Sequence, residues 1–467
     1  MTENKKELKS IMPDPEGKPL KGIRGEMVTF HEDPFLVEDE SKCYSYFQDG
    51  LVVMQGDKIL AAGPYSDIAP LYPELKDIDK YENSVIIPGM IDTHVHYVQS
   101  PMIGSFGDTL LQWLNQYTFP TESRFRSKDF SESVAQLFMG QILKQGTTTA
   151  NVFSTTFPTS VDALFEESER YNTCMITGKV LQDRNLPESL RDVSAEGSVA
   201  MAAELLDKWH GRGRQLYAVI PRFAPTSTPK QLELAGKLYQ NNIDKGVYMH
   251  THLDEADDEI EWALSLYPEA KNYTDIYRRF GLLGRRSVFA HCCLVKEEEW
   301  QMLHDHDCSV AHCPSSNLFL GDGMFKIWEA KQHNRPLRVG VGTDVGAGTN
   351  FSLPRQLNEA YKVSMLRKHS MGALKCFYMA TKGGAQTLHL EDKIGSLAPG
   401  YMADVTVIDL HPTEFLKWRM QFNDFILDRL FILQTLSPDN LIRATYVAGK
   451  RVYDRERDRQ LMYAEEL

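Results

Sequence analysis

The sequence lacks any long apolar run. No window approaches the ~20 uninterrupted apolar residues that span a bilayer. Residues 1–20 contain lysines but lack the apolar core of a signal peptide. Internal repeats, low-complexity tracts and long linkers are also missing. We therefore expect a chain that is neither exported nor inserted in a membrane, and that works in the cytoplasm.

Positive charge is scarce relative to negative charge. The chain has 51 Lys and Arg against 64 Asp and Glu, which gives a formal net charge of -13. An acidic surface repels both the phosphate backbone of nucleic acids and anionic membrane surfaces. We therefore expect no nucleic acid and no membrane among the partners of this protein.

Cysteine is limited to seven residues, an odd number without the spacing of a disulfide framework. Most of them stand within apolar runs. We interpret them as reduced, buried, small hydrophobic residues of a cytosolic protein. They are Cys43, Cys174, Cys292, Cys293, Cys308, Cys313 and Cys376.

Strand-like and helix-like segments alternate between residues 85 and 390. Short β-branched runs are followed by longer amphipathic stretches, which is typical of parallel strands and their crossover helices. Eight such units predict an α/β fold of the (β/α)₈ TIM-barrel type. The eight predicted strands are Val85–Ile91, Thr147–Phe153, Cys174–Leu181, Leu216–Phe223, Gly246–His252, Ser287–Ala290, Cys308–His312 and Leu337–Thr343.

The clearest helix is predicted over residues 127–146. Serine and aspartate stand near its start and a glycine ends it, as expected of helix caps. Its apolar residues recur with helical spacing. We expect the buried face to include Phe130, Val134, Leu137 and Ile142.

The two flanks have a different pattern, with short β-rich pieces separated by tight turns. Examples are Met27–Phe30 and Leu51–Gln55 near one end, and Ala403–Ile408 and Ile442–Val447 near the other. We predict that residues 1–84 and 395–467 together form a small β-sandwich domain outside a catalytic barrel at residues 85–394.

Histidines and one aspartate gather at the ends of predicted strands. His94 and His96 follow the first run, and a period of two puts both imidazoles on the same face. His252 ends the fifth run, His291 follows the sixth, and Asp344 follows the eighth. The carboxyl ends of barrel strands meet at one mouth, where barrel enzymes have their active sites. We therefore predict that these five residues bind one divalent metal ion.

Imidazole nitrogen and carboxylate oxygen suit zinc and iron alike and leave room for a water molecule. No carboxylated lysine is evident as a bridging ligand, so one ion is expected rather than two. Such an ion activates water for hydrolysis. Asp344 is then expected to take a proton from the attacking water, and Glu255 to move protons to the substrate. Glu255 and Asp344 are the predicted catalytic residues.

His250 and His312 also stand near strand ends, and either could replace one of the chosen ligands. We prefer His252 over His250 because only His252 is followed three residues later by the carboxylate of Glu255. His250 is interpreted as a core imidazole or as a support for a ligand.

Four motifs, in their order along the chain, resemble the amidohydrolase superfamily and in detail its guanine deaminase family: PGMIDTHVHYVQS, HTHLDE, FAHCCLV and VGVGTDVGAGT. The resemblance spans nearly the whole chain. It implies a zinc-dependent homodimer that hydrolyses guanine to xanthine and ammonia. It also implies zinc ligands at His94, His96, His252, His291 and Asp344, a proton shuttle at Glu255, and substrate contacts by Gln99, Arg222, Phe223 and His252.

Physical chemistry supports the substrate contact at Arg222 independently. Guanine has two adjacent acceptors, O6 and N7, which a planar guanidinium can bind together. Trp113 and Phe119, in the long first loop, either cover the purine ring or only hold that loop. Many members of the family read Ser-Glu-Asn where residues 254–256 read Asp-Glu-Ala, which leaves the exact substrate preference open.

Two alternatives stand beside this hypothesis. A related deaminase, acting on ammeline, 8-oxoguanine, cytosine or an adenosine derivative, would use the same metal and the same shuttle. A non-catalytic scaffold would keep the barrel, but such proteins typically lose ligands, and here all the expected ligands are present.

Overall fold

The computed structural model describes residues 14, 17–107 and 109–457. Most of the amino-terminal segment on which the expectation about export rests lies outside these residues. Across the described ranges, every helix is too short or too polar to cross a membrane.

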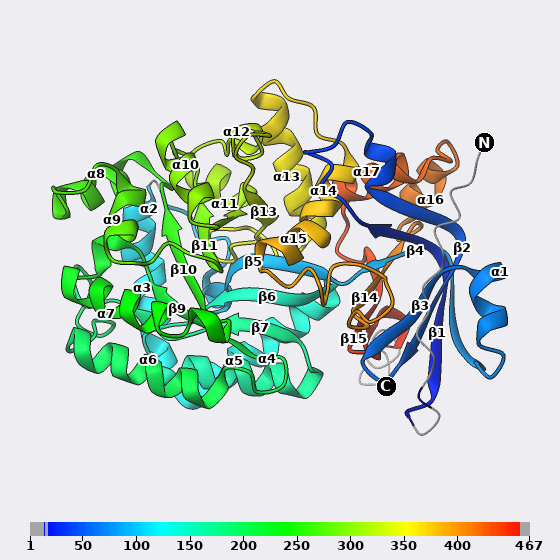
Figure 1. Ribbon diagram of the computed structural model, residues 1–467, viewed down its shortest axis with the longest axis horizontal. Coiled ribbons are helices and arrows are strands. Elements are labelled where there is room, and N and C mark those ends of the chain that lie inside the picture. The colour runs from blue at the N-terminus through cyan, green and yellow to red at the C-terminus, as the bar shows by residue number, and fades with distance from the viewer. Residues whose placement is uncertain (1–13, 15–16, 108, 458–467) are drawn as a thin grey trace.

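A barrel of parallel strands makes up one half of the molecule (Figure 1). Within the described residues its sheet has nine strands, of which eight follow one another around the barrel and the short β8 pairs with β9. The ends of the sheet meet where Asp344 N donates to the carbonyl oxygen of His94 at 2.9 Å. The predicted barrel is therefore confirmed. Its strands are β5 Met90–His96, β6 Thr147–Phe153, β7 Cys174–Thr177, β8 Val180–Leu181, β9 Leu216–Pro221, β10 Tyr248–Leu253, β11 Ser287–His291, β12 Ser309–His312 and β13 Arg338–Val341.

Helices surround the barrel (Figure 1). They are α4 Lys128–Lys144, α5 Pro158–Tyr171, α6 Ala195–Trp209, α7 Pro229–Gln240, α8 Asp257–Leu266, α9 Tyr273–Arg279, α10 Glu297–Asp305, α11 Pro314–Leu320, α12 Ile327–Ala330, α13 Leu353–Leu366, α14 Ala373–Met379 and α15 Lys382–Thr387. Helical turns also cover the mouth after β5: η3 Tyr97–Met102, α2 Leu110–Trp113, η4 Leu114–Thr118, α3 Phe119–Glu122 and η5 Ser123–Arg126.

The predicted helix at residues 127–146 is α4, and Ser127 caps its amino end through a bond from Phe130 N at 3.4 Å. The prediction for Leu137 is wrong, because this side chain is 54% exposed. The buried face runs through Val134, Phe138 and Ile142, which are four residues apart. Leu137 therefore lies about 100° away from that face.

Two predicted strands are divided at glycines. The run Val85–Ile91 combines the end of β4 (Asp77–Pro88) with the start of β5, and Gly89 separates them. The run Cys174–Leu181 breaks into β7 and β8 at Gly178, where a Cβ atom would lie 1.9 Å from the carbonyl oxygen of Ala218. A side chain at that position would push the neighbouring strand away.

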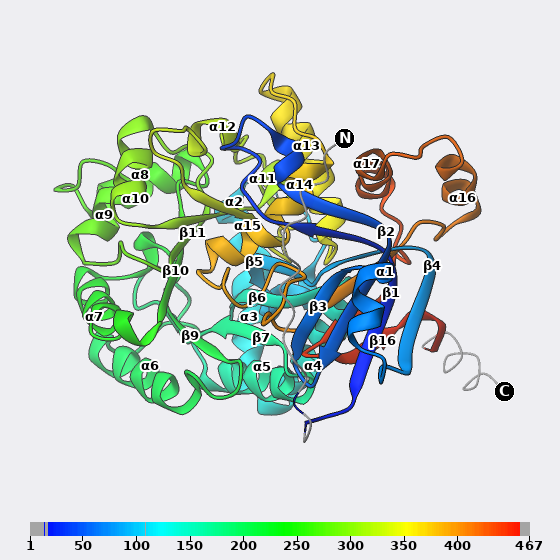
Figure 2. The ribbon, with the colours of Figure 1, turned by 45° about the vertical axis from the view of Figure 1, so that its right-hand side comes forward.

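Both ends of the chain pair in a second, separate sheet beside the barrel, as predicted (Figures 1 and 2). Among the described residues its seven strands follow the order β16-β15-β14-β4-β1-β2-β3 in one continuous sheet. The strands are β1 Leu20–Phe30, β2 Tyr44–Gln55, β3 Lys58–Pro64, β4, β14 Val405–Asp409, β15 Ile442–Val447 and β16 Lys450–Asp454. Short helices join them, namely α1 Tyr65–Ile68, α16 Glu414–Met420 and α17 Ile426–Leu436, with the turns η1 Glu40–Lys42 and η2 Ala69–Leu71.

All seven cysteines lie among the described residues, and each is buried and free of a disulfide bond. Their interpretation as small buried hydrophobic residues is confirmed.

Candidate active site

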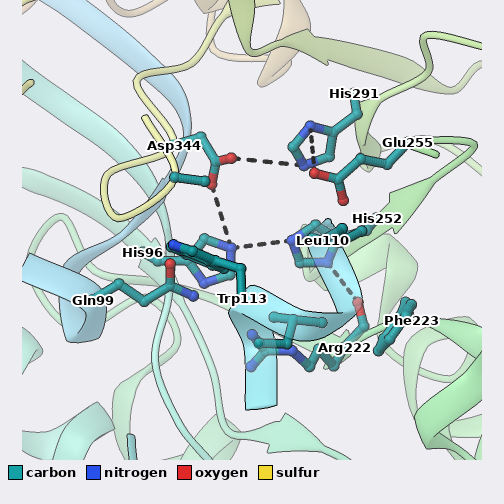
Figure 3. Close-up of a pocket in the computed structure, with 12 residues that line it drawn as sticks. His96, Gln99, Leu110, Trp113, Arg222, Phe223, His252, Glu255, His291 and Asp344 are labelled. Carbon is teal, nitrogen blue, oxygen red and sulfur yellow. Dashed lines mark hydrogen bonds and ion pairs between the residues drawn. The ribbon is translucent and has the colours of Figure 1, made fainter. Parts of the chain in front are cut away.

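Four imidazoles and one carboxylate meet at the mouth of the barrel, and Figure 3 shows four of these five side chains. Nε2 of His96 lies 3.1 Å from Nε2 of His252 and 3.6 Å from Oδ1 of Asp344. The same oxygen lies 3.1 Å from Nε2 of His94, and Oδ2 of Asp344 lies 3.9 Å from Nε2 of His291. The structure thus brings together all five residues for which the sequence predicts metal binding.

The opposite ring nitrogens of three of these histidines are held by hydrogen bonds. Each bond fixes the orientation of its ring and directs Nε2 toward the cluster. His250, whose role the sequence left open, supports a ring of the cluster in this way. The three bonds join His94 Nδ1 to His250 Nε2 (2.7 Å), His252 Nδ1 to the carbonyl oxygen of Arg222 (2.7 Å), and His291 Nδ1 to Asn317 Oδ1 (2.8 Å).

The backbone around these residues is locally strained. His291 and Asp344 have φ angles of 71° and 47°, in the left-handed region that costs energy for residues other than glycine. Asp92 joins the two strand ends that carry ligands, because its Oδ1 accepts hydrogen bonds from Thr343 N at 3.0 Å and from His94 N at 3.2 Å. The backbone just before Asp344 is therefore held to β5 by this carboxylate.

The electrostatic environment favours the neutral form of three of the four imidazoles. Burial lowers the pKa of His94, His96 and His252 well below the usual range of histidine. A neutral imidazole has a lone pair for a metal ion. Burial also raises the pKa of Asp344.

These residues fit a divalent metal ion. Within the described part of the chain, Nε2 of His94 and Nε2 of His291 are buried without a hydrogen-bond partner, and an unsatisfied buried polar atom typically costs about 1–3 kcal/mol. Ligand nitrogens of His94, His96 and His252 lie within 4.8 Å of one another. Nitrogen and oxygen donors of this kind are suited to zinc or iron.

Glu255 lies beside this cluster, with its Oε1 3.5 Å from His291 Nδ1. Burial, and then the nearby carboxylates of Glu259 and Asp344, raises the pKa of Glu255 well above its usual range. Burial and the neighbouring Glu255 also raise the pKa of Asp322, to about 9. A raised pKa favours the protonated form of this carboxyl group, which is the form able to donate a proton.

A pocket opens above the cluster (Figure 3). The empty space within it, which is partly open to solvent, measures about 370 Å³. Apolar and polar side chains both line it. They are His96, Gln99, Leu110, Trp113, Leu114, Arg222, Phe223, His252, Glu255, His291, Asp344 and Ala347.

All the residues with a predicted substrate contact line this pocket: Gln99, Arg222, Phe223 and His252. Sequence reasoning missed Glu122, which lies behind two of them. Arg222 Nη1 donates to both oxygens of Glu122, at 3.0 and 2.8 Å, and Gln99 Nε2 donates to the same carboxylate at 3.2 Å. Glu122 belongs to the helical cover of the mouth, so no strand-end signal could reveal it.

Three further positions that the sequence left open, Trp113, Phe119 and His312, have defined surroundings in the structure. Trp113 lines the pocket, and its Nε1 donates to the carbonyl oxygen of Ser105 at 3.0 Å, so it both covers the site and holds its loop. Phe119 packs on the guanidinium of Arg222 at 5.7 Å. His312 stacks on Phe325 at 4.5 Å instead of entering the pocket.

The chain matches known proteins over most of its length. The model of the amidohydrolase family matches residues 85–452. Guanine deaminase of Escherichia coli is 42% identical over 93% of this chain and 98% of that protein. Guanine deaminase of Mus musculus is 34% identical over 81% of this chain and 85% of that protein.

Solved structures give the same result. The structure of the E. coli guanine deaminase has a TM-score of 0.90 at 42% identity, and the match covers 93% of this chain and 100% of that one. A guanine deaminase from C. acetobutylicum, with guanine bound in its active site, has a TM-score of 0.82 at 28% identity over 93% of this chain and 100% of that one. These findings confirm the resemblance that the motifs indicated.

Proposed function

Since the chain belongs to the amidohydrolase family, we propose that its pocket hydrolyses guanine to xanthine and ammonia, which is the activity of a guanine deaminase. The observation that supports this most strongly is the joining of two groups of residues in one pocket. The candidate metal ligands form its floor, and Arg222, Gln99 and Phe223 line the same pocket. The match to the E. coli enzyme extends over 93% of this chain.

Members of this family depend on a metal ion. We propose that this chain holds one zinc ion, with iron as the alternative, through His94, His96, His252, His291 and Asp344. A bound divalent ion lowers the pKa of water from 15.7 toward ~7, and this is the chemistry that it would supply here.

The side chains then divide the proton transfers between them. Water adds to the ring carbon that carries the amino group of guanine, and Asp344 accepts a proton from this water. Its raised pKa makes its carboxylate a better base than an exposed aspartate. Glu255, whose raised pKa favours its protonated form, donates a proton to a ring nitrogen. The carbon–nitrogen bond then breaks as the amino group takes up the proton held by Asp344 and leaves as ammonia. The hydroxyl group on the ring carbon becomes the carbonyl of xanthine and returns a proton to Glu255.

Residues on the side of the pocket opposite the candidate metal ligands bind and orient the substrate. The guanidinium of Arg222 donates hydrogen bonds to O6 and N7 of guanine. Phe223 offers an aromatic face next to the ring, and Trp113 shields the site from water. The substrate is thereby held with its amino-bearing carbon toward the candidate metal ligands.

The test is an ammonia-release assay on purified protein over purines, pyrimidines and aminotriazines, with metal content measured on the same sample. We expect guanine to react far faster than cytosine or adenine, and we expect about one zinc ion per chain. Removal of the metal with a chelator should abolish turnover, and added Zn²⁺ should restore it. Equal or slower turnover of guanine than of another compound would reject the proposed substrate. Faster turnover of ammeline or 8-oxoguanine would support the related deaminase, and a metal-free, inert protein would support the scaffold.

We also propose that the chain forms a homodimer and works in the cytoplasm. The homodimer rests on the resemblance to the family. The compartment is supported by the seven buried thiols without a disulfide bond. Equilibrium sedimentation of the metal-loaded protein tests the dimer, and a mass of 53.2 kDa, that of one chain, would contradict it.

A further inference from the structure

Glu122 is a fully buried carboxylate behind the recognition side of the pocket. It is 0% exposed, and its two partners, Arg222 and Gln99, are 3% and 2% exposed. The partners come from different parts of the chain, because Arg222 follows β9 and Gln99 lies in η3 after β5. One carboxylate in α3 therefore holds two pocket side chains that are far apart in sequence.

The hydrogen bonds to Glu122 fix which atoms of its partners are left for a ligand. Gln99 uses its amide nitrogen on Glu122, at 3.2 Å, so its Oε1 is left as an acceptor. Gly346 makes room for this oxygen, since a Cβ atom there would lie 2.3 Å from Oε1. Arg222 uses Nη1 on both oxygens of Glu122, so its other guanidinium nitrogens are left as donors.

Figure 3 shows Gln99 and Arg222 on the same side of the pocket, in the lower part of the view, away from Asp344 and His291. The pocket thus has one wall of fixed polarity opposite the reacting groups. Arg222 offers donors on this wall and Gln99 offers an acceptor. A buried guanidinium also needs a charged partner, because an unpaired buried charge is strongly destabilising.

We propose that Glu122 is a positioning residue for purine recognition, holding Arg222 as a donor and Gln99 as an acceptor toward the ligand. This inference rests on the proposed function. The donors of Arg222 match guanine, whose O6 and N7 are adjacent acceptors. They oppose adenine, which has an amino donor in place of O6. Glu122 acts on the substrate only through its two partners and therefore affects binding more than chemistry.

The test compares Glu122→Gln, which keeps size but removes charge, with the matched control Glu167→Gln. Glu167 is another buried carboxylate, 6% exposed, in α5, and it pairs with Arg170 at 3.0 Å instead of lining the pocket. Metal-loaded proteins are assayed for kcat and KM with guanine, and their zinc content and melting temperature are measured. In Glu122→Gln we expect KM to rise about tenfold or more while kcat changes less than about threefold, because the effect is on binding shared by ground and transition states. Glu167→Gln should leave both constants within about twofold.

A double variant separates positioning from general structural support. Because Glu122 acts through Arg222 as well as through Gln99, the variant Glu122→Gln/Arg222→Gln should have a lower KM than the product of the two single effects predicts. Independent, multiplying effects of the two substitutions would overturn the proposal. So would an unchanged KM in Glu122→Gln, or a loss of kcat with KM unchanged.

If Glu122→Gln fails to fold, Glu122→Asp takes its place, because this variant keeps the charge but shortens the reach to Arg222 and Gln99. A raised KM in Glu122→Asp supports the proposal, and a wild-type KM overturns it. Wild-type protein that releases no ammonia from guanine refutes the proposed function. Normal wild-type turnover with unchanged KM in the variants refutes only the role of Glu122.

Discussion

Glu255 has an environment that ordinary carboxylates lack. It is buried, and the nearby acidic residues Glu259 and Asp344 add to the effect of burial in raising its pKa. Its Oε1 also lies 3.5 Å from His291 Nδ1, at the edge of the candidate metal site. The proposed proton shuttle is thus adjacent to the candidate metal ligands without being one of them.

Replacing Glu255 with glutamine should remove proton transfer alone. We expect kcat to fall by about 10²–10⁴-fold, the usual contribution of a general acid or base. The metal content should stay at the wild-type level, since the five candidate ligands are untouched. Steady-state kinetics together with elemental analysis check this, and a variant that loses its metal would make Glu255 a ligand instead.

His250 supports a candidate ligand without joining the cluster, through its bond of 2.7 Å to His94. We expect His250→Ala to lower metal affinity by about 10–100-fold, as is typical when the hydrogen-bond partner of a ligating histidine is removed. Competition with a chelator of known affinity measures this. His389→Ala is the matched control, because His389 is also a buried histidine and, among the described residues, neither of its ring nitrogens bonds to a candidate ligand. Equal affinities of the two variants would contradict the supporting role.

Functional residues were predictable from the sequence where they stand at the carboxyl end of a predicted strand. His94, His96 and Asp344 were predicted because the carboxyl ends of barrel strands converge whatever their separation in the chain. Glu122 had no such signal. It reaches Arg222, a hundred residues away, from a helical cover whose path depends on packing and not on a repeating pattern.

At the scale of elements, the loop between β8 and α6 is tied down by a buried ion pair. Lys179 Nζ lies 2.6 Å from Asp192 Oδ1, and both side chains are buried. Asp192 also accepts hydrogen bonds from Gln182 N at 2.9 Å and from Ser198 Oγ at 2.6 Å. Leu190 in the same loop packs into the apolar cluster around the pocket. The loop therefore packs against side chains that line the site.

Breaking this pair should cost far more than breaking an exposed one. Lys179→Met leaves the charge of Asp192 buried and unpaired, so we expect the free energy of unfolding to fall by about 3–5 kcal/mol. Lys128→Met is the control, because Lys128 and Glu132 form an exposed pair in α4 and such helix pairs contribute only about 0.3–0.5 kcal/mol. Denaturant unfolding at constant metal concentration measures both variants. Similar losses in the two would show that the Lys179 pair contributes little.

The sequence predicted the number and type of the strands and helices better than the residues at which they begin and end. Val85–Ile91 is apolar throughout except for Gly89, so periodicity could not show that the chain passes there from one sheet to the other. Leu137 shows the same limit within a helix. The helix α4 carries apolar side chains on more than one of its faces. The spacing of these residues alone does not show that Phe138 is buried and Leu137 is not, because this depends on packing against the rest of the protein.

At the scale of the whole molecule, alternating strands and helices predicted the barrel, and turn-rich flanks predicted a second sheet from both ends of the chain. The order of strands in that sheet was not predictable. β14 pairs antiparallel with β4, which comes more than 300 residues earlier, in a register that places Val405 opposite Pro88. Local patterns contain no information about a partner at such a distance.

The burial of all seven thiols gives the last prediction, which concerns the fold as a whole. Burial raises the pKa of Cys43 to about 11 and of Cys308 and Cys376 to about 12, and only a thiolate reacts with disulfide reagents. At pH 8, fewer than about one thiol per chain of the native, metal-loaded protein should therefore react rapidly with a disulfide reagent. In urea, all seven thiols should react. The thiols of the unfolded chain lose their protons at a lower pH than the buried thiols of the folded protein. The free energy of unfolding should therefore decline as the pH rises from about 8.5 toward 11. Several rapidly reacting thiols in the native protein would contradict the closed packing of both sheets.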